Sequence, residues 1–311
     1  MSATPSPSQD AVRRITVTDI ARMHADGERI AMLTAYDYPT AKLLDEAGLP
    51  MLLVGDSLGR AMLGYENELS VSMEDMLHHA SAVTRGARRA LVVGDMPFLS
   101  YATVDDSLRN AGRFIHEAGV QAVKVEGGVR SARVIEALVK AGIPVMGHIG
   151  LTPQSANAIG KFRVQGKTLE QARALLHDAL AVQEAGAFSV VLELVPEQLA
   201  TAITERLRIP TIGIGAGPGC SGEVQIVTDL LGLDTWQPKH ARPYANLRDV
   251  ILEAVRAYAA DVATRAFPGP EQTVRMDDAI LDEVLGRSGL DAPPGADADV
   301  PAGGIPLDRD L

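Results

Sequence analysis

Short apolar runs alternate with longer amphipathic stretches along the chain from about residue 29 to residue 267. Runs of this length predict buried β-strands, and the spacing of apolar residues in the longer stretches predicts helices with one buried face. The pattern therefore indicates repeated βα units. The predicted strands span residues 30–36, 51–55, 91–95, 122–126, 144–148, 189–193 and 211–215, with a weaker one at 224–227.

Helical stretches lie between these strands, among them residues 104–118, 131–140, 169–184 and 197–207. Eight βα units in about 240 residues match the length of a (β/α)₈ TIM barrel, whereas a doubly wound sheet more often has a Gly-rich first turn. We therefore expect an α/β protein with TIM-barrel architecture. A further amphipathic stretch, residues 18–25, is expected to form a helix that covers the bottom of the barrel.

The two ends of the chain differ in composition from the rest. We expect residues 1–14 to be a disordered N-terminal segment and residues 15–267 to be the barrel domain. Residues 268–311 are rich in Pro, Gly and Asp and contain three basic and ten acidic residues, so they carry 3 − 10 = −7 of the net charge of −11. We expect a disordered acidic tail with one short helix at residues 276–285.

Charge and cysteine content restrict the class of protein. With 29 Lys and Arg against 40 Asp and Glu, and a pI of about 5.1, the chain is not expected to bind nucleic acid or an anionic membrane surface. The single cysteine, Cys220, cannot form an internal disulfide. There is no signal-peptide core and no run of about 18 apolar residues. These features predict a cytoplasmic protein that acts on small molecules.

Ionisable residues lie at the carboxyl ends of successive predicted strands, where active sites of TIM barrels form. Each follows a run of apolar residues, so a charged group there must be paired, bound to a metal or located at the rim. Lys124 and Glu126 share one face of their strand, because side chains alternate along a strand, and should point into the barrel mouth. The whole set comprises Asp56, Asp95, Lys124, Glu126, His148 and Glu193.

Each residue also has a structural interpretation when taken alone. A carboxylate after a strand, such as Asp56, Asp95 or Glu193, could cap the next helix or stabilise a turn. His148 could be a hydrogen-bonded core histidine, and the Lys and Glu two residues apart could form an interior ion pair. Their convergence on one end of one fold favours a functional role.

The donor types favour a particular metal and reaction. Carboxylates without cysteine, and with one histidine, favour oxygen-ligated Mg²⁺ over Zn²⁺. A 2-oxo acid can chelate Mg²⁺ through its carboxylate and keto oxygens, and the metal then stabilises the developing enolate. A carboxylate such as Glu193 could remove the C3 proton.

Two predicted loops are further candidates for a functional role. The glycine-rich segment GIGAGPG, residues 213–219, is either a phosphate-binding loop or a tight turn with close backbone packing. Residues 150–167 form a mouth loop that is long enough to be a lid.

The words VGDSLG, GDMPF, KVEGG, GHIGLTPQS, LELVP and GIGAG occur in this order, and together they resemble the ketopantoate hydroxymethyltransferase family. The words LTAYDYPTAKLLDEAG and MLGYENELSVSMEDM extend the resemblance, which covers roughly residues 17–260. The segment GCSGEVQIV and residues 158–163 depart from the family pattern, but neither includes a proposed metal ligand or base.

The resemblance implies that 5,10-methylenetetrahydrofolate and 3-methyl-2-oxobutanoate react with water to give 2-dehydropantoate, a step toward pantothenate and coenzyme A. It also implies a homo-oligomer, commonly a homodecamer. By the same resemblance, Asp56 and Asp95 would bind Mg²⁺ and substrate, and Glu126 would complete the metal shell directly or through water. Ser57 and Lys124 would bind the oxo acid. Glu193 would remove the proton, and His148 would lie near the new hydroxymethyl group.

Two alternatives belong to other classes. A C–C lyase of the phosphoenolpyruvate and isocitrate lyase type has a similar barrel and also uses Mg²⁺ with an enolate. Such lyases typically carry a lid motif of the KKCGH type, whereas Cys220 lies in the glycine-rich loop. A non-catalytic binding barrel would be expected to lack at least one of the acidic residues, and none is missing.

Overall fold

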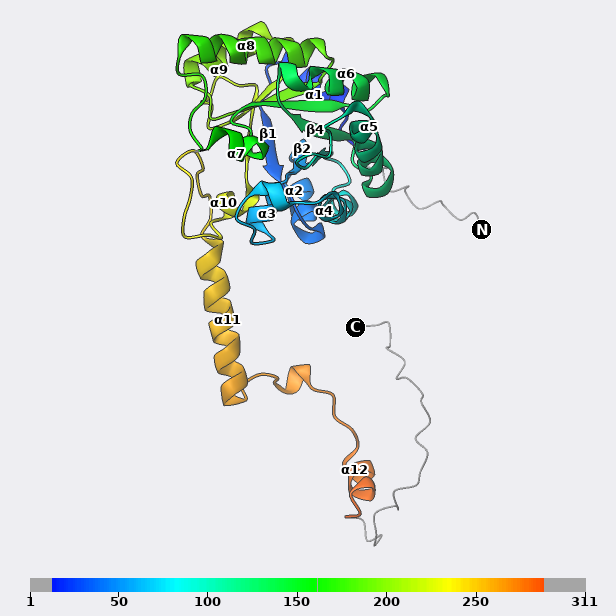
Figure 1. The fold of residues 1–311 in the computed structure, drawn as a ribbon. Helices are drawn as coiled ribbons and strands as arrows, with labels where there is room; N and C mark the ends of the chain where they lie inside the picture. The colour runs from blue at the N-terminus through cyan, green and yellow to red at the C-terminus, as the bar shows by residue number, and fades with distance from the viewer. Residues whose placement is uncertain (1–12, 161, 288–311) are drawn as a thin grey trace, which may run out of the picture. The chain divides into compact units, whose positions relative to one another are not determined.

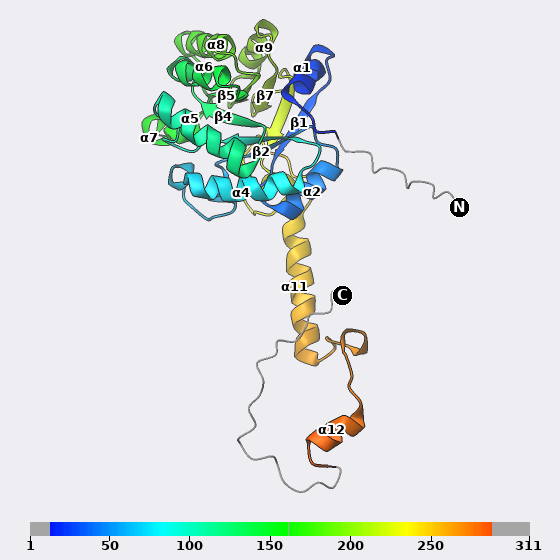
Figure 2. The same cartoon turned by 90° about the vertical axis from the view of Figure 1, so that its right-hand side faces the viewer.

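The computed structural model describes residues 13–160 and 162–287. Within these residues, eight parallel strands form a closed barrel in which each strand pairs with the next and β8 pairs with β1. Helices surround this barrel in Figure 1 and Figure 2. The predicted TIM-barrel fold is therefore confirmed. The strands are β1 (Ile30–Thr34), β2 (Met51–Val54), β3 (Leu91–Asp95), β4 (Ala122–Glu126), β5 (Val145–Gly150), β6 (Ser189–Glu193), β7 (Thr211–Ile214) and β8 (Gly222–Gln225).

The helices also lie close to their predicted positions, and most long ones begin at a residue whose side chain caps the first turn. They are α1 (Val17–Ala25), α2 (Tyr38–Glu46), α3 (Leu58–Ala61), α4 (Met73–Gly86), α5 (Val104–Arg113), α6 (Ala132–Lys140), α7 (Ala156–Ile159), α8 (Leu169–Glu184), α9 (Glu197–Arg206), α10 (Val227–Leu231), α11 (Leu247–Thr264) and α12 (Asp278–Val284). The helix predicted at residues 104–118 is divided into α5 and a π-helical turn at Phe114–Ala118.

The eighth strand differs from its predicted position at residues 224–227. It begins at Gly222, which pairs with Ile30 of β1 and with Ile212 of β7. Val227 instead begins α10. Glycine has a low intrinsic preference for strands, but closing the barrel requires backbone pairing on both sides of β8, and this tertiary requirement decides the register.

Alternation along the strands separates two apolar clusters. One fills the barrel interior and contains Met32, Leu91 and Met146. Ile20 of α1 belongs to this interior cluster and is fully buried, which places α1 at the amino-terminal end of the strands as a cover for the barrel bottom. This prediction is therefore confirmed, and the opposite end of the barrel is left for the polar residues.

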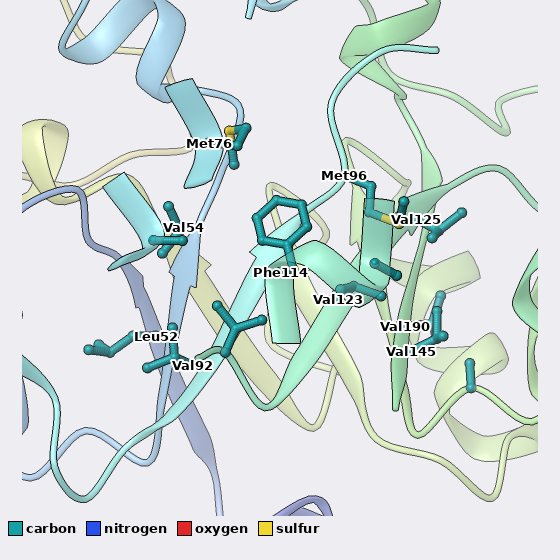
Figure 3. Packing of buried hydrophobic residues seen from close by; sticks show 14 of the residues in the cluster. Leu52, Val54, Met76, Val92, Met96, Phe114, Val123, Val125, Val145 and Val190 are labelled. Carbon is teal, nitrogen blue, oxygen red and sulfur yellow. The ribbon is translucent and has the colours of Figure 1, made fainter. Parts of the chain in front are cut away.

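The second cluster joins the outer faces of the strands to the helices, and Figure 3 shows part of it. Phe114, which follows α5, lies near Val92 of β3 and Val123 of β4 and is fully buried. A Cβ atom on Gly94 would lie 2.6 Å from the Phe114 ring. Glycine at this position therefore lets the aromatic ring pack directly on β3, one residue before Asp95.

The chain divides into two compact units, Met1–Arg248 and Asp249–Leu311. The domain boundary expected after Phe267 therefore lies within the second unit. α12 confirms the short helix predicted at residues 276–285. The sequence predicts disorder for residues 1–14 and, apart from this helix, for the whole tail from residue 268. Residues 1–12 and 288–311 lie outside the described part, and the described part of the tail also contains a 3₁₀ turn at Pro270–Gln272. Among the described helices, none has the length and apolar character needed to cross a membrane.

Candidate active site

The strand register brings the predicted polar residues together at the carboxyl end of the barrel. Asp95 of β3 lies opposite Lys124 of β4, and Glu126 of β4 lies opposite His148 of β5. Glu193 is the last residue of β6. Val123 and Val125 belong to the outer cluster, so Lys124 and Glu126 alternate with them and occupy the interior face.

Lys124 is at the centre of this group. Its Nζ lies 2.8 Å from Asp95 Oδ1, 3.7 Å from Glu126 Oε1 and 3.2 Å from His148 Nδ1. All four residues are buried. A buried ammonium requires such partners, because an unpaired charge in this environment would be costly.

His148 connects Lys124 to the proposed base. Its Nδ1 lies 3.3 Å from Glu126 Oε1, and its Nε2 lies 3.2 Å from Glu193 Oε2. Nδ1 can accept a hydrogen bond from Lys124 or donate one to Glu126, depending on the tautomer, but cannot do both at once. The Glu193 side chain is 16% exposed, against 4% for His148, so Glu193 is the member of this chain that faces the mouth.

Asp56 and Ser57 follow β2 and lie beside the same group. The backbone N–H of Asp56 donates to Asp95 Oδ2 at 3.1 Å, which fixes the two acidic residues next to each other. The Ser57 hydroxyl lies 3.0 Å from the hydroxyl of buried Tyr36. The structure thus brings together all seven residues singled out from the sequence.

Burial and mutual repulsion shift the titration of these acids. Burial, and then the nearby Asp95 carboxyl, raise the pKa of Asp56 well above its ordinary range. Burial also raises the pKa of Asp95. Burial opposes the charged form of Lys124, but the surrounding carboxylates outweigh it and raise the pKa of this amine. For Glu126, burial is outweighed by the nearby His148 ring and the charge of Lys124, which together lower its pKa.

The sequence did not single out Gln154, a buried residue in the loop after β5. Its side chain donates to Asp56 Oδ2 at 2.8 Å and to the Met96 carbonyl at 2.9 Å, and it accepts a hydrogen bond from the Tyr101 hydroxyl. An amide carries no charge, so a search for ionisable groups at strand ends passes over it. Gln154 lies in the motif GHIGLTPQS, but the motif does not reveal which residues its side chain contacts.

Glu68 was also missed. It is 5% exposed, and its Oε2 makes no hydrogen bond with any described residue. Burial raises its pKa, and the carboxylates of Glu193 and Glu126 add to this effect against the opposing charge of Arg60. Glu68 therefore adds a further buried acid near the base.

The residues fit a hard divalent cation through their donor chemistry. Asp95 Oδ1 and Glu126 Oε1 are buried and make no hydrogen bond of acceptable geometry with the described residues, although Lys124 contacts both. Across residues 13–160 and 162–287, no three His, Cys, Asp or Glu side chains converge as a ready-made metal site. Mg²⁺ commonly uses one or two carboxylates and takes its other ligands from water and substrate, so these observations are compatible.

The glycine-rich loop has a packing role. Cβ atoms on Gly213 and Gly219 would lie 2.8 Å from Glu223 Oε2 and 2.0 Å from Thr201 Oγ1, and Gly215 and Gly217 have positive φ angles. These contacts and conformations require glycine. Of the two interpretations of GIGAGPG, they support the tight turn with close packing.

The closed barrel and the buried carboxylates, lysine and histidine at its carboxyl end define the chain as a (β/α)₈-barrel protein with the constellation of an enzyme active site. Residues 14–270 match the sequence profile of the family described as ketopantoate hydroxymethyltransferase. The chain belongs to this family. The protein therefore belongs to a family of enzymes and is not one of the non-catalytic binding barrels.

Relatives agree over most of the chain. It is 58% identical to the 3-methyl-2-oxobutanoate hydroxymethyltransferase of Chloroflexus aurantiacus, over 88% of this chain and 97% of the relative. The enzyme of the same name from Chloroflexus aggregans is 59% identical, over 88% and 98% of the two chains. The enzyme of that name from Heliobacterium modesticaldum is 53% identical, over 86% and 97%.

Two solved enzyme structures share the fold at low identity. A phosphonopyruvate hydrolase, in a complex with oxalate and Mg²⁺, superposes with a TM-score of 0.54 and 13% identity, covering 88% of this chain and 96% of that one. A 2,3-dimethylmalate lyase of the PEP mutase/isocitrate lyase superfamily gives 0.52 and 17%, covering 88% and 95%. At this identity the likeness concerns the fold alone.

Proposed function

We propose that this protein transfers a hydroxymethyl group from 5,10-methylenetetrahydrofolate to 3-methyl-2-oxobutanoate. With one water, the products are 2-dehydropantoate and tetrahydrofolate, so atoms balance across the reaction. Membership of the family and relatives named for this activity support the proposal. The reaction would place the protein in pantothenate and coenzyme A biosynthesis.

The proposed roles are those that the family resemblance implies, and the positions of the residues support them. Asp56 and Asp95 would hold Mg²⁺, with Glu126 in contact directly or through water. When bound, this ion supplies the positive charge that stabilises an enolate of the 2-oxo acid. Lys124, the ammonium beside these acids, and Ser57 would bind the carboxylate end of the substrate.

Glu193 would remove the C3 proton. Its side chain is 16% exposed, against 4% for His148 and 1% for Glu126, so it can contact a substrate in the mouth, and His148 Nε2 lies 3.2 Å from its carboxylate. The C3–H bond breaks and its proton passes to Glu193, and C3 then bonds to the one-carbon unit. Both carbon–nitrogen bonds that join this unit to folate break, water supplies the oxygen of the new hydroxyl group, and the remaining protons end on the two nitrogens of tetrahydrofolate. His148 would lie near this new hydroxymethyl group.

One observation carries the proposal: an accessible carboxylate, Glu193, stands next to a buried cluster in which acids outnumber the single ammonium of Lys124. Such a cluster is suited to a divalent cation and a chelating anion, and the carboxylate is placed to act as a base on that anion.

Proton NMR of 3-methyl-2-oxobutanoate in D₂O tests the proposal without folate. We expect the C3 proton signal to decay in the presence of the protein and Mg²⁺, and to persist when EDTA removes the metal. Addition of 5,10-methylenetetrahydrofolate should then produce 2-dehydropantoate. A C3 signal that persists with Mg²⁺ would refute enolate formation, and exchange without product would refute the carbon donor.

We further propose that the chain self-associates, as a homodecamer by analogy with its family. α11 supports this: Ile251, Val255, Tyr258 and Val262 form an apolar stripe along one side of the helix and are 44–58% exposed in the single chain. Such a stripe is suited to packing on another copy. Light scattering should report a large oligomer that Tyr258→Glu dissociates, whereas Glu253→Lys on the opposite face of the helix should not; a monomeric wild type would refute the proposal.

A further inference from the structure

Gln154 makes an unusual number of contacts for an uncharged residue at this site. It is 5% exposed and lies in the short 3₁₀ turn Pro153–Ser155 after β5. Its backbone N–H donates to Glu126 Oε2 at 3.1 Å, and its side-chain Nε2 donates to Asp56 Oδ2 at 2.8 Å. One residue thus contacts two of the three proposed metal ligands.

The orientation of the Gln154 amide is determined by its partners. The Met96 carbonyl can only accept a hydrogen bond, so it must face the amide nitrogen, and the same nitrogen donates to Asp56 Oδ2. The Tyr101 hydroxyl, from the loop after β3, then donates to the amide oxygen. Every hydrogen-bonding direction of the side chain except one lone pair is used, so the amide cannot rotate without losing several buried hydrogen bonds.

We propose that Gln154 is a positioning residue for the metal site: it holds the Asp56 carboxylate in place and connects the loop after β5 to the residues that bind the cation. The inference rests on the proposed function, since it needs Asp56 to be a ligand. Hydrogen bonds to a charged carboxylate are among the stronger ones, and a ligand that is fixed before the cation arrives loses less freedom on binding.

The Tyr101 hydroxyl gives this arrangement a second anchor. Among the described residues Tyr101 makes no hydrogen bond with Asp56, so its hydroxyl reaches this proposed ligand through Gln154, although it also lies against the Glu126 backbone. If Gln154 positions Asp56, loss of the Tyr101 hydroxyl should weaken metal binding in the same direction but by less, because the donors of the amide remain.

Calorimetric titration of the purified, metal-free protein with MgCl₂ tests the inference directly. Gln154→Leu, similar in volume but without donors, should weaken Mg²⁺ binding by about 10–100-fold, as is typical when a partner of a metal ligand is removed. Tyr101→Phe should weaken it by about three- to tenfold. The matched control is Gln171→Leu, an exposed residue on α8, and it should bind Mg²⁺ like the wild type.

The rate of C3 proton exchange provides a second readout. Raising the Mg²⁺ concentration above the weakened Kd should restore most of the exchange rate in Gln154→Leu and all of it in Tyr101→Phe. A variant that only misfolds would lower the number of Mg²⁺ sites per chain in the calorimetric titration, not the affinity of the sites that remain. If both variants bind Mg²⁺ as tightly as the wild type, or excess metal restores nothing, the inference is wrong. If the wild type itself does not bind Mg²⁺, the proposed function fails instead.

Discussion

His148 Nε2 lies 3.2 Å from Glu193 Oε2, so the last polar residue of β5 contacts the last residue of β6. On its other side the His148 ring contacts Lys124 and Glu126. The Glu193 carboxylate thus has the His148 ring beside it and remains partly exposed. This combination suits a base that must reach a carbon-bound proton on a small substrate.

Replacing the Glu193 carboxylate by an amide should separate binding from proton transfer. Glu193→Gln keeps the size of the side chain and removes the base, so C3 exchange in D₂O should fall by about 10²–10⁴-fold. Calorimetric binding of 3-methyl-2-oxobutanoate with Mg²⁺ should change little. Exchange at the rate of the wild type would exclude Glu193 as the base.

Asp95 should affect metal and substrate together. Its carboxylate contacts Lys124 and accepts a hydrogen bond from the Asp56 backbone N–H, so Asp95→Asn removes the negative charge that attracts both the metal and the lysine. We expect the affinities for Mg²⁺ and for the 2-oxo acid to fall in parallel, each by about 10–100-fold, as is typical of changes at a metal site. Asp105→Asn, exposed on α5, is the control. Loss of affinity for only one of the two ligands would contradict the shared site.

The barrel and the faces of its strands could be predicted from the sequence because they depend on periodicity alone. Lys124 and Glu126 alternate with valines, and this alternation already indicated that both point inward. Asp95 and Lys124 lie opposite each other because of the strand register, and parallel pairing favours such contacts between residues at neighbouring strand ends. These contacts can therefore be predicted from the alternation of residues along each strand once the TIM-barrel fold is assumed.

Other features depend on the path of loops and on barrel closure, which local pattern does not encode. Gln154 reaches Asp56 across the barrel mouth, from a loop 98 residues further along the chain. Gly222 is a strand residue only because β1 and β7 pair with it on both sides. Glu68 lies in a short 3₁₀ turn between α3 and α4, where no periodicity indicates burial.

Gly94 and Phe114 should be energetically coupled. A methyl group on Gly94 would lie 2.6 Å from the ring, so Gly94→Ala should lower the free energy of unfolding by about 1–3 kcal/mol in urea titrations. Combining it with Phe114→Leu, which removes ring atoms, should cost less than the sum of the single changes, since contacting residues are not additive. Gly112→Ala in α5 meets nothing within 4 Å and should be stabilising by about 0.5–1 kcal/mol. Strict additivity of the pair would contradict this packing.

Glu223 on β8 should make stability depend on pH away from the active site. Burial raises the pKa of its carboxyl from 4.5 to about 7, so the folded protein retains a proton that the unfolded chain has lost. Between pH 4.5 and about 7 the unfolded state binds fewer protons than the folded state, and Glu223 therefore lowers stability progressively as pH rises through this window.

Glu223→Gln removes this titration while keeping the size of the side chain. The Tm of the variant relative to the wild type should therefore increase from pH 4.5 to about 7 and stay constant above it. Solvent screening should reduce the size of this Tm difference, because the carboxyl is only partly buried. The exposed Glu28→Gln, measured by calorimetry under the same conditions, should show a smaller change across this range. If the Tm difference for Glu223→Gln is flat or falls as pH rises, the carboxyl at β8 is better solvated, or better partnered, than its packing indicates.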